Sequence, residues 1–279
     1  MFLYKSSRKI LCKIKAITRR IFIGDEFRLT ALEKWRLHFS KPRSQQSVSL
    51  LGKKIQITDS FWFEHLYRDI FEQQIYKFIS PMPDPLIIDC GAHIGLSVIY
   101  FKKLYPQSTI VAFEPDPEIF SMLNNNINLL NLENVDLYQA AVWESNGTIK
   151  FSPNGSVGGK IAKDDGANRS GIIVKTIRLK EFLGKPIQFL KIDIEGAENK
   201  VLPDIASELS MVQHMFVEYH GDPNQDQTVS NILDIIQKAG FKYFITQAHP
   251  YPPAHPFIVS EYAKYTFDLQ LNIFCYRKS

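Results

Sequence analysis

The chain has 279 residues, of which 45% are hydrophobic and 22% are charged. This composition is typical of a globular protein and argues against a disordered, collagen-like or low-complexity chain. The three cysteines, Cys12, Cys90 and Cys275, lie far apart and argue against a disulfide framework or a cysteine-built zinc site. Such sparse use of cysteine is typical of a reducing compartment, so we expect a cytoplasmic protein. No run of 18 apolar residues is present, so the sequence contains no candidate membrane span.

The net charge of +4 is unevenly distributed along the chain. Residues 1–23 contain seven basic residues and no acidic one, which leaves 26 basic and 29 acidic residues in the remainder. Because that remainder is negatively charged, we expect no nucleic-acid partner. Apolar residues recur at helical spacing within residues 1–23, which predicts a basic amphipathic helix. Such a helix can pack on its own domain or make a peripheral contact with an anionic membrane.

Residues 40–58 read as a break between this basic segment and the rest of the chain. Loop-like sequence is followed by short β-type material at residues 54–58. We therefore expect a basic helical extension and linker over residues 1–58, followed by one larger domain over residues 59–279.

Helical and strand patterns alternate through the larger domain. Asp59 or Ser60 is placed to cap its first helix, and an Asn-Gly turn at residues 146–147 predicts a hairpin into residues 149–151. The alternation predicts an α/β fold with a doubly wound, mostly parallel sheet and a late antiparallel strand. The predicted helices cover residues 59–78, 96–101, 117–130 and 226–239, and the predicted strands cover residues 86–88, 109–113, 135–142, 188–192, 215–219, 241–246 and 269–276.

The first predicted strand leads into the sequence Asp-Cys-Gly-Ala-His-Ile-Gly at residues 89–95. Gly91 permits a tight turn and a close backbone approach, and Gly95 lets the next helix pack closely. The dinucleotide fingerprint would need a glycine where His93 stands. Asp89 would repel a pyrophosphate but attract a cationic ligand that resembles methionine.

The second predicted strand ends in Glu114, 25 residues after Asp89. Ligands of open α/β sheets bind outside the carboxyl ends of the strands, so both side chains are expected at one site. A carboxylate at the second strand can accept hydrogen bonds from both hydroxyls of a ribose. The glycine turn and Glu114 together predict a site for S-adenosylmethionine.

Five sequence motifs resemble those of the FkbM family of methyltransferases. They are IIDCGAHIG at residues 87–95, VAFEPDP at 111–117, VKTIRLKEFL at 174–183, LKIDIEGAE at 190–198 and VEYH at 217–220. The resemblance extends over about residues 60–277 and implies a Rossmann-like class I methyltransferase fold. It also implies S-adenosylmethionine as the methyl donor and O-methylation of a sugar, a glycan or a secondary-metabolite intermediate.

The resemblance implies roles for individual cofactor-binding residues. One departure is His93, because the family usually has the sequence Gly-Ala-Asn at this turn. By resemblance, the methionine part of the cofactor is bound by Asp89, Gly91, His93 and Gly95, the ribose by Glu114, and the adenine lies near Ala141 and Val142.

Acidic residues and a histidine follow the fourth and fifth predicted strands. Asp193 is followed by Glu195 and Glu198, while Glu218 and His220 end the next strand. Such a group is costly unless it binds protons, cations or substrate hydroxyls, so we expect Asp193, Glu218 and His220 to be catalytic. In one assignment His220 is the general base, with its proton affinity raised by Asp193 or Glu218. In the other, Asp193 and either Glu218 or His220 hold a divalent cation such as Mg²⁺ that lowers the pKa of the acceptor hydroxyl. Glu195 and Glu198 also suit a helix start.

Three other functions remain as alternatives. Amino-methylating enzymes of nucleic acids carry a polar-Pro-Pro-aromatic tetrad after the fourth strand, where this chain has Asp-Ile-Glu-Gly at residues 193–196. A non-catalytic adaptor that docks through its basic N-terminus would be expected to lose the strand-end acids, and these are present. A dehydrogenase would require the glycine turn to bind a dinucleotide, although the turn lacks the dinucleotide fingerprint. We expect acceptor specificity to lie in the loops at residues 59–80, 152–171 and 247–268.

Overall fold

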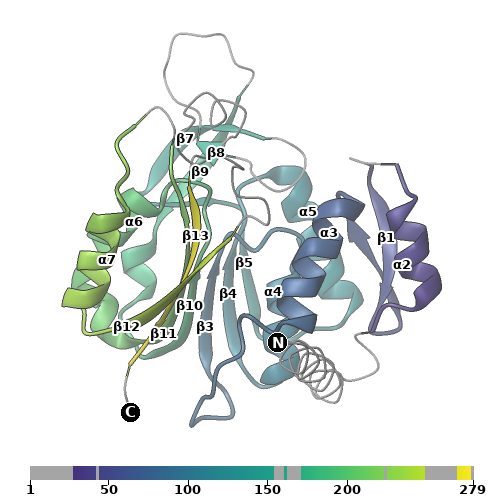
Figure 1. The fold of residues 1–279 in the computed structure, drawn as a ribbon, viewed down its shortest axis with the longest axis horizontal. Coiled ribbons are helices and arrows are strands. Elements are labelled where there is room, and N and C mark those ends of the chain that lie inside the picture. Colours follow the sequence, from purple (N-terminus) through teal and green to yellow (C-terminus); the bar gives the residue numbers. More distant parts are fainter. Residues whose placement is uncertain are drawn as a thin grey trace, which may run out of the picture.

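A seven-stranded sheet forms the centre of the computed structural model, which describes residues 28–41, 44–153, 160–161, 171–222, 225–248 and 269–277 (Figure 1). Its strands are β3 (Leu86–Cys90), β4 (Thr109–Phe113), β5 (Val135–Tyr138), β10 (Ile187–Ile192), β11 (Val212–His220), β12 (Lys242–Gln247) and β13 (Gln270–Tyr276). They lie in the order β12-β13-β11-β10-β3-β4-β5. Neighbouring strands are parallel except that β13 runs antiparallel to β11 and β12. The predicted doubly wound α/β fold with a late antiparallel strand is therefore confirmed.

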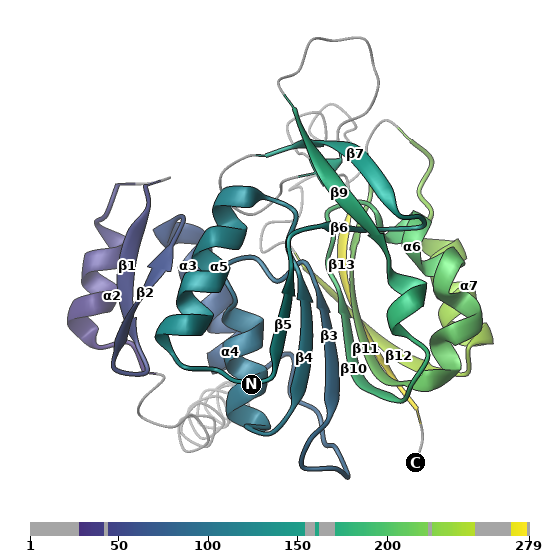
Figure 2. The ribbon, with the colours of Figure 1, turned by 180° about the vertical axis from the view of Figure 1, so that it is seen from behind.

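Helices cover both faces of this sheet (Figures 1 and 2). One face carries α3 (Ser60–Tyr67), α4 (Leu96–Leu104) and α5 (Pro117–Leu129), and the other carries α6 (Glu198–Ile205) and α7 (Val229–Lys238). Successive residues of a strand pack on opposite faces. Ile87 packs in the core with α3, α4 and α5, and Ile88 packs in the core with α6 and α7. Because both faces are buried, the strands read as continuous apolar runs rather than alternating ones.

The first predicted helix begins where expected but ends earlier. The Asp59 carboxylate caps α3 by accepting hydrogen bonds from the backbone N–H groups of Phe61 and Trp62. The helix then passes into a π-helical turn, η2 (Arg68–Glu72), and stops there instead of reaching Phe78. π-Helical turns are uncommon and recur at functional sites.

Residues 44–58 form a hairpin where the sequence predicted a linker with one short strand. Its strands are β1 (Gln46–Leu50) and β2 (Lys53–Ile57), preceded by α2 (Ala31–His38). The inward side chains of β1 and β2 join the core that contains α4 and α5. The Asn126 side chain of α5 accepts a hydrogen bond from Gln56 N and donates one to Ile94 O, which fastens the hairpin beside the glycine turn. The helix predicted within residues 1–23 lies outside the described residues.

A second, smaller sheet follows β5. It contains β6 (Ala141–Trp143), β7 (Gly147–Ser152), β8 (Lys160–Ile161) and β9 (Ile172–Arg178), in the order β6-β9-β7-β8. The strand predicted over residues 135–142 is thus divided between two sheets. The predicted hairpin at residues 146–147 is wrong, because β9 lies between β6 and β7. Asn146 is bound to that intervening segment: its side chain accepts from Arg178 N and donates to Glu181.

None of the helices in the described parts of the chain is long and apolar enough to cross a bilayer. Most of the predicted loop at residues 152–171, and almost all of residues 247–268, lie outside the described residues.

Candidate active site

The glycine turn after β3 brings two strand ends into contact. Gly91 has a φ of +87°, and a Cβ atom there would lie 1.9 Å from the carbonyl oxygen of Asp193. Gly95 has a φ of +93°, and its Cβ would lie 2.8 Å from Leu123 of α5. Only glycine meets both demands, a left-handed backbone and no side chain. The close approach predicted for Gly91 is confirmed, and the close neighbour of Gly95 is α5.

A buried lysine connects the carboxylates at the ends of β3 and β10. Lys191 Nζ lies 3.3 Å from Asp89 Oδ1 and 3.1 Å from Asp193 Oδ2, and it donates to Gly91 O at 2.8 Å. Ser97 donates to the other oxygen of Asp89, whose side chain is fully buried. Burial lowers the pKa of Lys191, but Asp193 and Asp89 outweigh it and raise the pKa well above its usual value. The ammonium is therefore charged, paired with two carboxylates and hydrogen-bonded to the backbone of the glycine turn.

Sequence reasoning missed Lys191. A lysine inside the apolar strand Phe-Leu-Lys-Ile was a usable signal, since a lysine is rarely buried without a charged partner. Asp193 follows Lys191 at the end of the same strand. Asp89 lies on the neighbouring strand, so its contact with Lys191 depends on the register between β3 and β10.

Glu114 directly follows β4, at the predicted strand end, and is also buried. Its two carboxylate oxygens accept hydrogen bonds from His93 N at 3.0 Å and from Asp116 N at 2.9 Å. Burial raises the pKa of Glu114 to about 7, and the charge of Asp116 adds to this effect, while the two backbone hydrogen bonds oppose it. Each oxygen has a further lone pair, so the carboxylate can still accept hydrogen bonds from ligand hydroxyls.

His93 brings unused hydrogen-bonding groups to the glycine turn. Its backbone has a φ of +49°, uncommon for a residue with a side chain. Both ring nitrogens are buried, and neither has a hydrogen-bond partner among the described residues. Burial lowers the pKa of His93 to about 4, so the ring is neutral and offers one donor and one acceptor. These unused groups, beside the open lone pairs of Glu114, suit the polar parts of S-adenosylmethionine.

The residues predicted near the adenine lie in β6. Ala141 packs against the core of the small sheet, and Val142 packs against the core of the large one. Both side chains are buried. Their contact with an adenine stays a prediction.

His220, at the end of β11, is enclosed by carboxylates. Its Nδ1 lies 3.1 Å from Glu198 Oε1, and its Nε2 lies 3.6 Å from both Glu195 Oε2 and Glu218 Oε1. Burial lowers the pKa of His220, but Glu195 and Glu198 outweigh it and, with Glu218, raise the pKa well above 6.5. The ring is therefore an imidazolium at neutral pH.

This protonation state disfavours the two roles considered for His220. An imidazolium has no lone pair, so it cannot accept a proton as a general base, and the carboxylates that hold its proton are chiefly Glu195 and Glu198 rather than Asp193. Donor atoms of Asp193, Glu195 and His220 do lie within 4.8 Å of one another, with Glu195 taking the place predicted for Glu218. A cation bound by His220 would have to displace the proton of the ring. Binding of Mg²⁺ at this site stays a prediction.

Glu198 holds the loop between β10 and α6. Its carboxylate accepts hydrogen bonds from Ile194 N and Gly196 N as well as contacting His220. Glu198 is the first residue of α6, but its carboxylate binds the loop before the helix and makes no cap hydrogen bond to the helix. Glu195 instead has a φ of +56° and faces His220, and burial raises its pKa to about 8.

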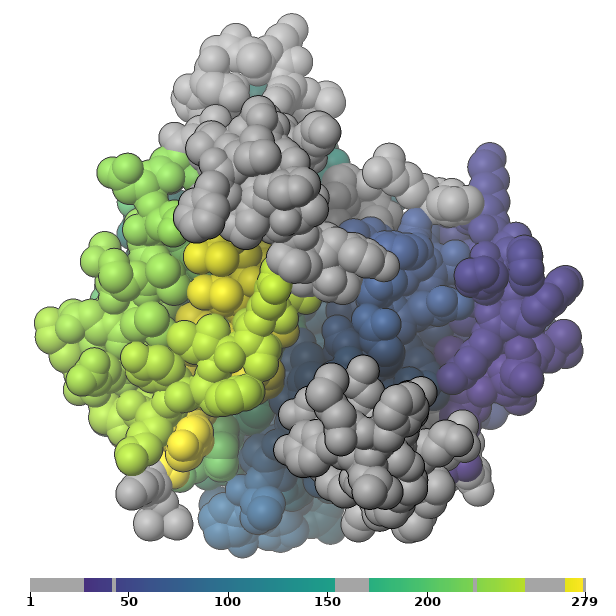
Figure 3. All heavy atoms as spheres, viewed as in Figure 1, coloured from purple at the N-terminus to yellow at the C-terminus, as the bar shows by residue number. Residues whose placement is uncertain are grey.

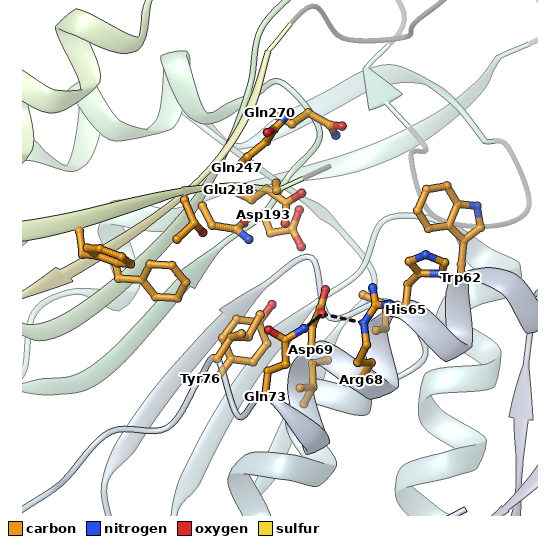
Figure 4. Close-up of a pocket in the computed structure, with 18 residues that line it drawn as sticks. Trp62, His65, Arg68, Asp69, Gln73, Tyr76, Asp193, Glu218, Gln247 and Gln270 are labelled. Carbon is orange, nitrogen blue, oxygen red and sulfur yellow. Dashed lines mark hydrogen bonds and ion pairs between the residues drawn. The ribbon is translucent and has the colours of Figure 1, made fainter. Parts of the chain in front are cut away.

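A cavity of about 550 Å³ opens beside Asp193 and Glu218 (Figure 4). One wall comes from α3, η2 and the turn that follows them, and the facing wall comes from β12 and β13. Asp193 and Glu218 lie between the two walls, at the strand ends. The labelled residues of the first wall are Trp62, His65, Arg68, Asp69, Gln73 and Tyr76, and those of the second are Gln247 and Gln270.

Comparison with known proteins identifies the family of this chain. Residues 89–243, more than half of the chain, match the Methyltransferase FkbM domain. Methyltransferase 1 of Beauveria bassiana is 28% identical over 239 residues, which cover 73% of this chain and 94% of that protein. Methyltransferase sdnD of Sordaria araneosa is 31% identical over 191 residues, covering 56% and 74%. The 2-O-methyltransferase NoeI of Sinorhizobium fredii is 27% identical over 157 residues, covering 49% and 64%. The chain is therefore a methyltransferase and belongs to the FkbM family.

Proposed function

We propose that the protein transfers a methyl group from S-adenosylmethionine to a hydroxyl oxygen of a sugar, a glycan or a secondary metabolite. The observation that carries this proposal is the position of Asp193. It contacts Lys191, which in turn binds Asp89 and Gly91 of the predicted cofactor turn, and it also lines the 550 Å³ cavity. One side chain thus links the donor half of the site to a space large enough for an acceptor.

The donor half has groups that suit each part of the cofactor. The turn from Asp89 to Gly95 would hold the methionine part, with the neutral His93 ring in hydrogen-bonding reach, and Glu114 would hold the ribose. S-adenosylmethionine supplies an electrophilic methyl group on a sulfonium. A positive sulfonium suits this edge of the sheet, because the three carboxylates of Asp89, Asp193 and Glu218 carry more negative charge than the ammonium of Lys191 balances.

The acceptor half suits a molecule with many hydroxyls. Gln73, Gln247 and Gln270 each present an amide, which can both donate and accept hydrogen bonds, and Trp62 and Tyr76 add aromatic surface. The O-methyltransferase NoeI among the relatives supports oxygen as the accepting atom.

Family chemistry and acceptor choice would reside in different parts of the cavity. Of the residues that line it, only Asp193 and Glu218 lie within the stretch that matches the family domain. The others belong to residues 62–76 and 244–274, which flank that stretch. This division supports the expectation that segments 59–80 and 247–268 select the acceptor.

The chemical roles follow from the charges. Asp193 and Glu218 would orient the acceptor hydroxyl and receive its proton, since both carboxylates reach the cavity. His220 would act through Glu218: its imidazolium, held by Glu195 and Glu198, would fix the position of that carboxylate. Lys191 would fix Asp193 in the same way.

Isothermal titration calorimetry tests the donor assignment directly. We expect S-adenosylmethionine to bind with micromolar affinity and nicotinamide cofactors not to bind. Glu114→Ala should weaken binding at least about tenfold, because hydrogen bonds to a charged group contribute roughly 1.5–3 kcal/mol each. Unchanged affinity in a folded Glu114→Ala protein would exclude the ribose assignment. Cofactor binding without any transfer to a panel of glycosides and polyols would instead favour the adaptor alternative.

A further inference from the structure

The N-terminal part of the chain has a net positive charge, whereas the rest has a net negative charge. Residues 1–58 contain 14 basic and three acidic residues, whereas residues 59–279 contain 19 basic and 26 acidic ones. The described portion of this basic part is α2 with the β1–β2 hairpin. It forms one edge of the molecule, coloured purple in Figure 3. Six basic residues and one acidic residue lie in this described portion, so the edge itself is positively charged.

An apolar stripe on α2 faces outward from this basic edge. Leu32, Trp35 and Phe39 are 74%, 63% and 68% exposed, although three large apolar side chains would normally be buried. Their spacing of three and four residues places them on one side of the helix. The Trp35 and Phe39 rings lie 5.0 Å apart. The core contact of α2 is made by Leu37, which is buried, so the outer stripe is not needed to attach the helix.

We propose that this stripe docks the protein onto an anionic lipid bilayer. Tryptophan and phenylalanine are favoured where a helix lies in the membrane interface, and cations beside them bind acidic headgroups. Exposed Lys53 and Lys54 supply such cations on the same edge, and the basic residues 1–23 precede it in the sequence. A nucleic acid would use the cations but has no need of an exposed Leu-Trp-Phe stripe. This inference does not depend on the proposed methylation reaction.

Vesicle flotation of the full-length protein tests this docking. We expect binding to vesicles of phosphatidylcholine with phosphatidylserine, weak binding to phosphatidylcholine alone, and release by added salt. The triple variant Leu32→Ser, Trp35→Ser, Phe39→Ser should lose at least about tenfold in partitioning. The matched control is Ile79→Ser with Ile173→Ser, at side chains that are 84% and 69% exposed elsewhere on the surface, and it should float like the original protein.

Fluorescence gives a second measurement that does not depend on the folding of the triple variant. Brominated phosphatidylcholine in the anionic vesicles should quench tryptophan emission of the original protein, and Trp35→Phe should abolish that quenching while Trp62 and Trp143 remain. Flotation of the triple variant equal to that of the original protein, or quenching that persists in Trp35→Phe, would overturn the proposal. So would binding to RNA or heparin in place of vesicles.

Discussion

The ion pairs of Lys191 give a quantitative test of how this site is held together. We expect Lys191→Met to destabilise the protein strongly, because it leaves the carboxylate of Asp89 fully buried without its cation. Removing one partner of a buried ion pair costs about 3–5 kcal/mol. The free energy of unfolding of a typical domain is about 5–15 kcal/mol, so this loss is a large fraction of it. It corresponds to a fall in Tm on the order of 10 °C.

The chain offers a matched control in Lys238, which pairs with Asp234 at 2.7 Å on the surface of α7. That pair is shorter than either carboxylate contact of Lys191, but its lysine side chain is 76% exposed, against 3% for Lys191. Exposed pairs of this kind contribute about 0.3–0.5 kcal/mol, so Lys238→Met should scarcely change Tm. If the length of the ion pair governed stability, Lys238→Met would destabilise the protein more than Lys191→Met. Because burial governs it in our reasoning, Lys191→Met should be the more destabilising variant.

Urea denaturation and thermal melting of both variants measure these free energies. The double variant Lys191→Met, Asp89→Asn should recover part of the loss, since it also removes the unpaired charge, and this coupling identifies the pair as the cause. A Lys191→Met protein within about 1 kcal/mol of the original would refute the reasoning, as would a double variant whose two effects simply add.

Three further predictions concern the site itself. Gly91→Ala should abolish S-adenosylmethionine binding and destabilise the protein more than Gly52→Ala does. Both positions have a positive φ, but only at Gly91 would the new Cβ meet backbone, at the carbonyl oxygen of Asp193. Calorimetry and thermal melting compare the two variants, and equal losses of stability would point to backbone strain alone. The affinity for S-adenosylmethionine should fall as the pH drops below about 7, the pKa of Glu114, because protonation removes acceptor capacity from that carboxylate. In Glu114→Gln the affinity should be weaker but independent of pH. The same pH dependence in both proteins would exclude Glu114 as the titrating group. Asp193→Asn should lower turnover at least about a hundredfold once an acceptor is known, with cofactor affinity retained, and near-normal turnover would remove Asp193 from the chemistry.

The doubly wound α/β fold and the strand-end edge that carries the candidate site could be predicted from the sequence. Apolar runs alternating with helical patterns indicate a doubly wound sheet, because a strand buried on both faces must be apolar throughout. The carboxyl ends of parallel strands share one edge, so Asp89, Glu114 and Asp193 were expected at one site without knowledge of distances. Glycine positions were equally readable, since a left-handed turn leaves little choice of residue at Gly91.

Pairing across the sheet was decided only by the tertiary structure. Lys191 meets Asp89 because β10 lies beside β3, although the two residues are about a hundred positions apart in the chain. β9 separates β6 from β7, so an Asn-Gly turn that locally favours a hairpin does not form one. Secondary-structure propensity and hydrophobic periodicity describe neighbours along the chain. They contain no information about which distant strand pairs with a given strand.

The charge states of the site likewise depended on three-dimensional surroundings. From the sequence, His220 could be a base or a metal ligand, since its spacing to the acids allowed either. In the fold, Glu195 and Glu198 reach it from the loop after β10 and from α6, and their charges outweigh the desolvation of the ring. A pKa is set by burial and by the charges within a few ångströms, and both quantities exist only once the chain has folded.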